Sequence, residues 1–124
     1  MTASLGAVVI GTPDPPALAA FYAALLGWAT VTSEPGWARL RDPERERPGL
    51  SFQREPTDVA PTWPGRAGGV SMQAHVDVLV DDLDAEQARA VALGASVEEH
   101  QPTLGVRVCR DPHGHLFCLF LPGA

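Results

Sequence analysis

The spacing of apolar residues predicts two amphipathic helices, one in each half of the chain. A helical pattern follows Asp14-Pro15-Pro16 and ends at Leu26-Gly27. Its buried stripe is formed by Leu18, Phe21, Tyr22 and Leu25. A second helical pattern opens at residues 81–84 (DDLD) and ends at Leu93-Gly94. Both begin at an aspartate suited to the N-cap and end at a glycine suited to the C-terminal cap, which supports the two boundaries.

Short stretches typical of β-strands surround each predicted helix. In the first half they span residues 5–10, 29–34, 37–41 and 50–54. In the second half they span residues 72–80, 96–100, 106–110 and 117–121. Each half therefore predicts the order β-α-β-β-β, which is an α+β fold made of two tandem modules.

A repeated turn and a composition change support this division. Residues 36–43 (GWARLRDP) resemble residues 105–112 (GVRVCRDP), and each run leads from a strand into an Asp-Pro turn. The two helical patterns and the two turn runs follow each other in the same order in both halves, which indicates an internal duplication. Residues 56–69 are rich in proline and glycine, as expected of a linker. We expect one domain over residues 1–124, with module one at 1–55 and module two at 70–124.

Composition limits the partners of the chain. Its 124 residues include 45% hydrophobic and 19% charged residues, which is typical of a globular domain. A formal net charge of −6 argues against nucleic acid as a partner. No apolar run approaches the roughly 20 residues that span a bilayer, and no basic signal-peptide segment opens the chain. We therefore expect a cytoplasmic protein without a membrane partner, in which the two cysteines stay reduced.

Three segments carry a family resemblance. Residues 17–22 (ALAAFY) with 26–28 (LGW) resemble the first-helix signature of the vicinal oxygen chelate superfamily, which includes glyoxalases, bleomycin-resistance proteins and dioxygenases. Residues 75–84 (HVDVLVDDLD) resemble the opening of its second module, and residues 111–119 (DPHGHLFCL) its closing turn and strand. The divergent glyoxalase-like domain branch is the most similar. The resemblance implies curved mixed sheets around a cup for a small molecule, and commonly a homodimer.

In metal-dependent members of that superfamily, each module supplies ligands from its first and last strands. Carried over by resemblance, the second-module positions are His75 and Cys118, where relatives have a glutamate in the last strand. The first-module positions fall on Ala7 or Val8 and near Phe52-Gln53. Because a catalytic metal needs about three protein ligands, we expect no bound metal and no other cofactor, and we name no catalytic residue.

The candidate ligand-binding residues are aromatic or polar side chains on the predicted strands and linker: His75, Trp37, Phe52, Gln53, Trp63, Arg107 and Cys118. Each has an alternative. The aromatic residues also suit the core, and Trp63 can simply pack onto its own module. Arg39, Arg54 and Arg107 each have an even chance of facing solvent, because side chains alternate along a strand. Cys109 and Cys118 suit a soft zinc site with His75, although two buried apolar thiols explain them better.

The remaining polar motifs have structural explanations. His113 and His115 lie in an Asp-Pro-x-Gly turn and are expected at a rim. The aspartates Asp14, Asp81, Asp82 and Asp84 are better explained by helix capping than by acid–base chemistry. The leading hypothesis is metal-free binding of a small aromatic molecule in an apolar cup. The alternatives are a lyase, isomerase or dioxygenase that uses a metal or His75, and an interaction module without a ligand.

Overall fold

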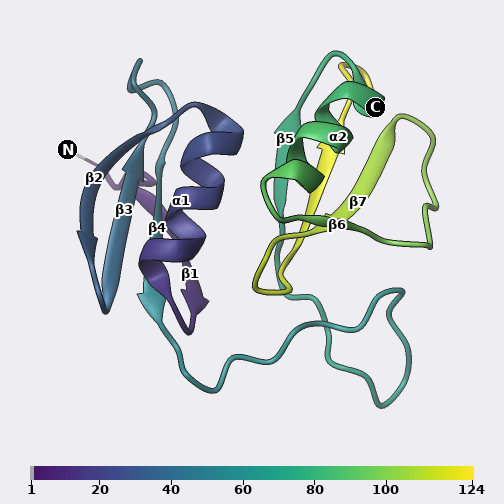
Figure 1. Cartoon of the computed structure of the whole chain (residues 1–124), viewed down its shortest axis with the longest axis horizontal. Helices are drawn as coiled ribbons and strands as arrows, with labels where there is room; N and C mark the ends of the chain where they lie inside the picture. The colour runs from purple at the N-terminus through teal and green to yellow at the C-terminus, as the bar shows by residue number, and fades with distance from the viewer. Residues whose placement is uncertain (1) are drawn as a thin grey trace. The chain divides into compact units, whose positions relative to one another are not determined.

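The computed structural model describes residues 2–124, which form two compact units that divide between Asp58 and Val59. We call them unit 1 and unit 2 and describe each by itself. Each contains one helix and one four-stranded mixed sheet (Figure 1). This confirms the α+β fold class and the β-α-β-β-β order expected for both halves of the chain.

Unit 1 contains the elements β1 (Ala7–Thr12), α1 (Pro15–Leu26), β2 (Ala29–Glu34), β3 (Trp37–Arg41) and β4 (Gly49–Arg54). The strand order is β1-β4-β3-β2. Strands β1 and β4 pair in parallel, and the other neighbours are antiparallel. Since the chain must cross over to make the parallel pair, α1 lies over one face of the sheet.

Unit 2 repeats this arrangement. Its elements are β5 (Val76–Leu79), α2 (Leu83–Ala92), β6 (Ser96–Val97), β7 (Val106–Arg110) and β8 (Leu116–Phe120). The strand order is β5-β8-β7-β6, and β5 pairs in parallel with β8. Equal strand orders with the same parallel pair confirm the internal repeat predicted from the sequence.

The core of unit 1 lies between α1 and the sheet. The predicted stripe is confirmed, because Leu18, Phe21, Tyr22 and Leu25 are all buried. Tyr22 stacks on Phe52 of β4 with ring centroids 5.7 Å apart. The Asp14 carboxylate accepts the backbone N–H of Ala17 and caps the helix, which ends at Gly27 in a left-handed conformation. The face of the sheet that carries Phe52 therefore packs against α1, and we call the opposite face the helix-free face of unit 1.

In unit 2, Arg107 shows which face of the sheet carries α2. Its guanidinium hydrogen-bonds to Gln87 of the helix and lies 3.3 Å from an oxygen of Asp84. Side chains alternate along β7, so Val108 points to the opposite side of the sheet. Cys118 pairs with Val108 and lies on that same side, which we call the helix-free face of unit 2.

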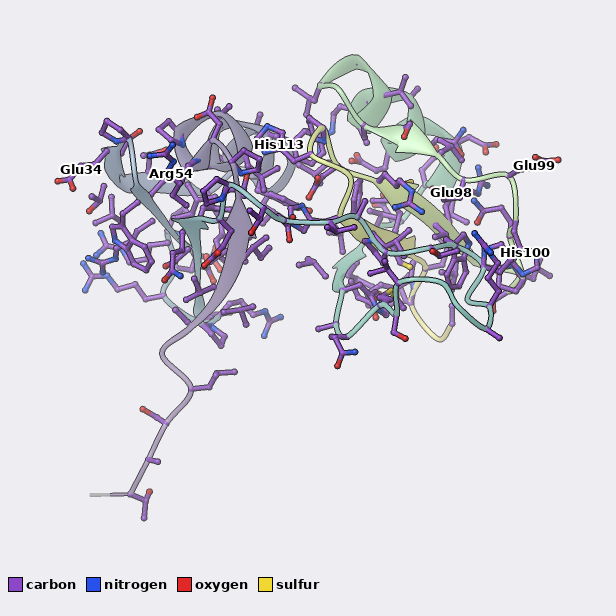
Figure 2. The ribbon with its side chains drawn as sticks, turned by 90° about the horizontal axis from the view of Figure 1, so that it is seen from below. Glu34, Arg54, Glu98, Glu99, His100 and His113 are labelled. Atoms are coloured by element: carbon purple, nitrogen blue, oxygen red, sulfur yellow. The ribbon has the colours of Figure 1, made fainter. Side chains whose placement is uncertain are left out.

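Two strands of unit 2 are shorter than predicted. Strand β5 covers only Val76–Leu79, because its pairing with β8 begins at Val76, after residues 72–75. Strand β6 covers only Ser96–Val97, although the segment continues through Glu98, Glu99 and His100 (Figure 2). There the side-chain amide of Gln101 bonds both the N–H and the C=O of Val108 at 2.7 and 2.8 Å, and the same C=O also accepts the backbone N–H of Glu98 at 3.0 Å.

Candidate functional site

The helix-free face of unit 2 is apolar at its centre. Val108, Leu116 and Cys118 form a buried group on it, and three partly buried side chains pack against this group: Trp63, Met72 and Val106. The Trp63 indole N–H donates to the carbonyl of His100 at 3.0 Å, which fixes the ring. A linker tryptophan and strand residues far apart in the sequence thus form one apolar surface within the unit.

Three polar groups meet beside this surface. His75 Nε2 lies 2.9 Å from Asp77 Oδ1. Asp77 is the register partner of Cys118 in the parallel pair, and the donor atoms of His75, Asp77 and Cys118 lie within 4.8 Å of one another. Burial raises the pKa of the Cys118 thiol to about 11, and the charge and hydrogen bond of Asp77 add to this effect. We call these three residues the His75 group.

Cys109 does not belong to the His75 group. It lies next to Val108 in β7 and therefore on the face that carries α2. Burial raises the pKa of the Cys109 thiol to about 11, and the charge of the nearby Cys118 adds to this effect. The alternative of a zinc site formed by both cysteines and His75 is therefore wrong, because the side chains alternate and the two thiols lie on opposite faces of the sheet.

The same positions in unit 1 hold different chemistry. Ala7 precedes the Asp14 cap by the same number of residues as His75 precedes the Asp82 cap of α2. By the same count Val9 matches Asp77. Val9 pairs with Ser51 just as Asp77 pairs with Cys118. Ser51, rather than Phe52 or Gln53, is thus the match to Cys118, which corrects the position predicted from the sequence.

The other predicted ligand-binding residues divide between the two faces of each sheet. Trp37 and Gln53 are register partners in unit 1, on the helix-free side, and Gln53 donates to Glu55 at 3.0 Å. Phe52 is fully buried against Tyr22, and Arg107 bonds to α2. The structure therefore brings together Trp63, His75 and Cys118, keeps Trp37 and Gln53 in unit 1, and directs Phe52 and Arg107 toward the helices.

The remaining histidines and aspartates have structural partners. His115 Nδ1 lies 3.0 Å from Oδ2 of Asp111, whose side chain is fully buried within its turn. His113 lies in the same turn (Figure 2), and its backbone N–H donates to Asp111 at 2.9 Å. Asp82 caps α2 by accepting the N–H of Ala85, as Asp14 does for α1. The capping interpretation of Asp14 and Asp82 is thereby confirmed.

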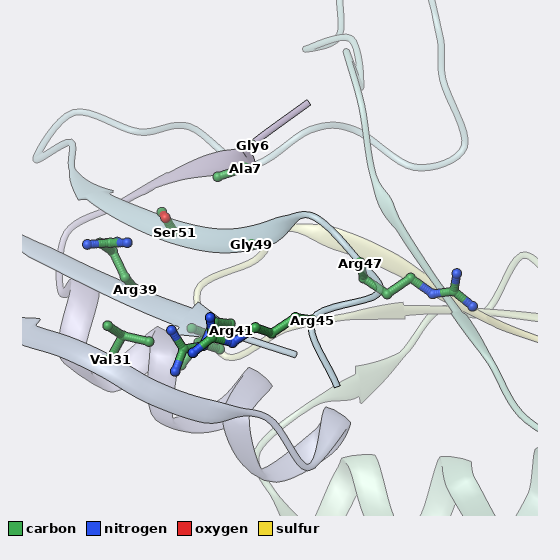
Figure 3. Close-up of a pocket in the computed structure, with 10 residues that line it drawn as sticks. Gly6, Ala7, Val31, Arg39, Arg41, Arg45, Arg47, Gly49 and Ser51 are labelled. Carbon is green, nitrogen blue, oxygen red and sulfur yellow. The ribbon is translucent and has the colours of Figure 1, made fainter. Parts of the chain in front are cut away.

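Unit 1 contains a basic pocket that the sequence analysis missed. It has a volume of about 200 Å³ and lies on the helix-free face. Its lining combines small residues with four arginines: Arg39, Arg41, Arg45 and Arg47 (Figure 3). Of these four arginines, the sequence analysis named only Arg39 as a candidate polar anchor, because it considered arginines on strands and Arg45 and Arg47 lie between strands.

The donor chemistry decides which metal the His75 group suits. One nitrogen, one oxygen and one sulfur donor fit zinc better than the oxygen-rich octahedral sites of magnesium or manganese. Unit 1 offers Ala7, Val9 and a serine hydroxyl at the matching positions. A metal ligated in the same way by both repeats therefore does not fit these residues, whereas a three-donor zinc site within unit 2 does.

Fold and site together define a class of protein: an α+β protein of two β-α-β-β-β repeats, with polar or charged groups on the sheet faces away from the helices. Residues 7–120 match the glyoxalase-like domain family, so the chain belongs to that family. It is part of the vicinal oxygen chelate superfamily, as the sequence motifs indicated. No curated protein gives a significant sequence match. Among residues 2–124, no helix has the length and apolar character needed to cross a membrane.

Solved structures show the same fold at low sequence identity. A glyoxalase/bleomycin resistance protein/dioxygenase family enzyme from Burkholderia phytofirmans has a TM-score of 0.73 and 19% identity, covering 96% of this chain and 98% of its own. The bleomycin-binding protein of Streptomyces verticillus, solved with copper(II)-bleomycin, has a TM-score of 0.61 and 19% identity, with 98% of both chains covered. A lactoylglutathione lyase from Agrobacterium tumefaciens has a TM-score of 0.63 and 20% identity, covering 98% and 95%. A binding protein and a lyase thus share this fold, so the site must decide between these functions.

Proposed function

We propose that this chain binds a small aromatic molecule on the helix-free face of unit 2, without a catalytic metal. The observation that carries the proposal is the apolar surface of Trp63, Met72 and Val106 beside His75. An aromatic ring gains most from contact with a fixed tryptophan and aliphatic side chains. One imidazole at the edge of such a surface supplies the polar contact that orients a ligand.

The chemistry of unit 1 supports the metal-free part of the proposal. The positions that match His75 and Asp77 are Ala7 and Val9, whose side chains cannot bind a metal. In the His75 group itself, a metal would have to displace the proton of a thiol with a pKa of about 11. Both features lower the affinity expected for a divalent cation near neutral pH.

Binding is tested by titrating the protein with a panel of flat aromatic compounds, followed by calorimetry and tryptophan fluorescence. A ligand on this surface should quench Trp63. The quenching should disappear in Trp63→Phe and persist in Trp28→Phe, a matched control in unit 1. His75→Ala should weaken binding by about tenfold, the loss expected for one buried polar contact. Absence of binding across the panel would contradict the proposal.

The His75 group supports a second candidate function, a zinc-dependent lyase or isomerase. Zinc would be held by His75, Asp77 and Cys118, and it would supply a Lewis acid for a substrate oxygen. The test is elemental analysis of protein purified without chelators, together with cobalt titration to detect thiolate ligation. Stoichiometric metal that is lost in His75→Ala and Cys118→Ser, but retained in Cys109→Ser, would favour this function over the first.

The homodimer expected from the family resemblance belongs to the same proposal. Sedimentation analysis across a range of protein concentrations tests it directly. A single species of 13.1 kDa throughout would contradict a dimer.

A further inference from the structure

We propose that the basic pocket of unit 1 binds an oxyanion, the carboxylate or phosphate group of a small molecule. Besides the four arginines, the pocket is lined by small residues, Gly6, Ala7, Gly49 and Ser51, and by two aliphatic residues, Val31 and Leu40. Its volume of about 200 Å³ is below that of pockets for drug-sized ligands, roughly 300 Å³ or more, so it suits a charged group better than a whole ligand. The inference concerns unit 1 alone and does not rest on the proposed function of unit 2.

The arginines are available for an external anion. Within residues 2–124, none of the guanidinium groups of Arg39, Arg41 and Arg45 hydrogen-bonds or pairs with a carboxylate, and Arg47 is equally unpartnered. The described lining includes no acidic residue. The Arg47 guanidinium extends away from the other three (Figure 3), so the first three are the proposed donors. Like charges held near one another without a counter-charge favour an anion between them.

The duplicated turn supplies an independent observation. In unit 2, buried Asp111 accepts the N–H groups of His113 and His115, and Gly114 has a φ of +93°. In unit 1, buried Asp42 accepts the N–H groups of Glu44 and Glu46 at 3.0 and 3.2 Å.

Arg45 takes the place of Gly114 in this turn, with a φ of +58°. A left-handed conformation is unfavourable for arginine and favourable for glycine. At this position the turn of unit 2 has the residue that the conformation favours, whereas the turn of unit 1 has an arginine that lines the pocket. Strained residues of this kind cluster at binding sites, because the function of the side chain outweighs the backbone cost. Arg45 is therefore the residue that distinguishes a binding pocket from a merely basic surface.

The small lining residues are also consistent with a bound anion. A Cβ on Gly49 would come within 3.3 Å of the Leu40 carbonyl oxygen, a tight contact that favours glycine at this position. Ser51 lies beside it in β4 and places a hydroxyl donor on the same face. Three guanidinium groups and a hydroxyl that line one pocket make a set of donors that suits a planar carboxylate or a phosphate.

Titration calorimetry with inorganic phosphate, pyrophosphate, succinate and citrate, with succinamide as the neutral control, tests the proposal. We expect one site per chain for at least one anion, none for succinamide, and weaker binding as the salt concentration rises. Binding to phosphates alone or to carboxylates alone identifies the source of the oxyanion, and either supports the site. Binding only to a long polyanion such as heparin would overturn it.

The decisive variant is Arg45→Gly, and its matched control is Arg54→Gln, which removes a charge outside the pocket. Arg45→Gly should weaken anion binding by about tenfold. Its melting temperature should not fall, because glycine adopts the left-handed conformation more readily. Arg54→Gln should bind as the wild type does. Equal losses in both variants, or no anion binding by the wild type, would overturn the proposal. Neither result affects the titration of unit 2 with aromatic compounds, so one proposal can be contradicted while the other stands.

Discussion

The thiol of Cys118 tests the geometry of the His75 group in solution. With a pKa of about 11, the thiol should be about 0.1% ionised at pH 8, compared with about 10% for an ordinary cysteine at 9.0. Since the thiolate is the nucleophile, iodoacetamide should react with Cys118 about 100-fold more slowly than with a free cysteine. The measurement uses Cys109→Ala protein, in which Cys118 is the remaining thiol.

The midpoint of the rate–pH profile is the quantity to compare, because steric shielding slows the reaction equally at every pH. Asp77→Asn removes the charge that adds to burial, so the midpoint should move below 11 but stay above 9. Asp84→Asn is the matched control, since Asp84 pairs with Arg107 on the α2 side of the sheet. An unchanged midpoint in Asp77→Asn would show that this carboxylate does not face the thiol. A wild-type midpoint near 9 would show that the thiol is not buried.

Three further predictions concern stability. Folding raises the pKa of both thiols from 9.0 to about 11, so their contribution to the free energy of unfolding is complete below pH 9 and is lost between pH 9 and 11. The free energy of unfolding in urea should therefore fall over that interval, and it should fall less in a Cys109→Ala/Cys118→Ala variant. Phe52→Ala should lower the free energy of unfolding by about 3–5 kcal/mol, whereas Gln53→Ala, at an exposed neighbour, should change it by less than about 0.5 kcal/mol; similar losses would contradict the core position of Phe52. Gln101→Ala should cost about 1–3 kcal/mol because the backbone N–H of Val108 loses its partner and the C=O of Val108 keeps only the N–H of Glu98. An effect no larger than that of Gln73→Ala, at an exposed position, would contradict this.

Local patterns predicted most of the fold. The caps Asp14 and Asp82, the stripe on α1 and the Asp-Pro turns depend on neighbours a few residues away, which a sequence displays directly. The bounds of β2, β3 and β7 agree with the prediction for the same reason. Strand β6 was predicted too long, because the side chain of Gln101, one residue past the predicted end, takes the N–H of Val108 that a backbone partner would otherwise bond.

The site was predicted only in part. His75, Trp63 and Cys118 were named as candidates, but nothing in the sequence shows that Asp77 lies beside Cys118, since the parallel register of β5 and β8 decides that contact. Phe52 was named as a ligand-binding candidate because an aromatic residue on a strand suits the wall of a binding cup and the protein core equally. The basic pocket was missed because its arginines come from β3 and from a turn, which only folding brings together.

The sequence alone determined the repeat, the helices and the alternation of side chains, because these depend on periodicity and on local hydrogen bonds. It determined that Ser51 and Gln53 share one face of β4 and that Phe52 lies on the other. It did not determine which face the helix covers, because alternation has no preferred side until the crossover packs onto the sheet. The tertiary structure made that choice, and with it placed Phe52 in the core, Ser51 under the arginines, and Cys118 beside Asp77.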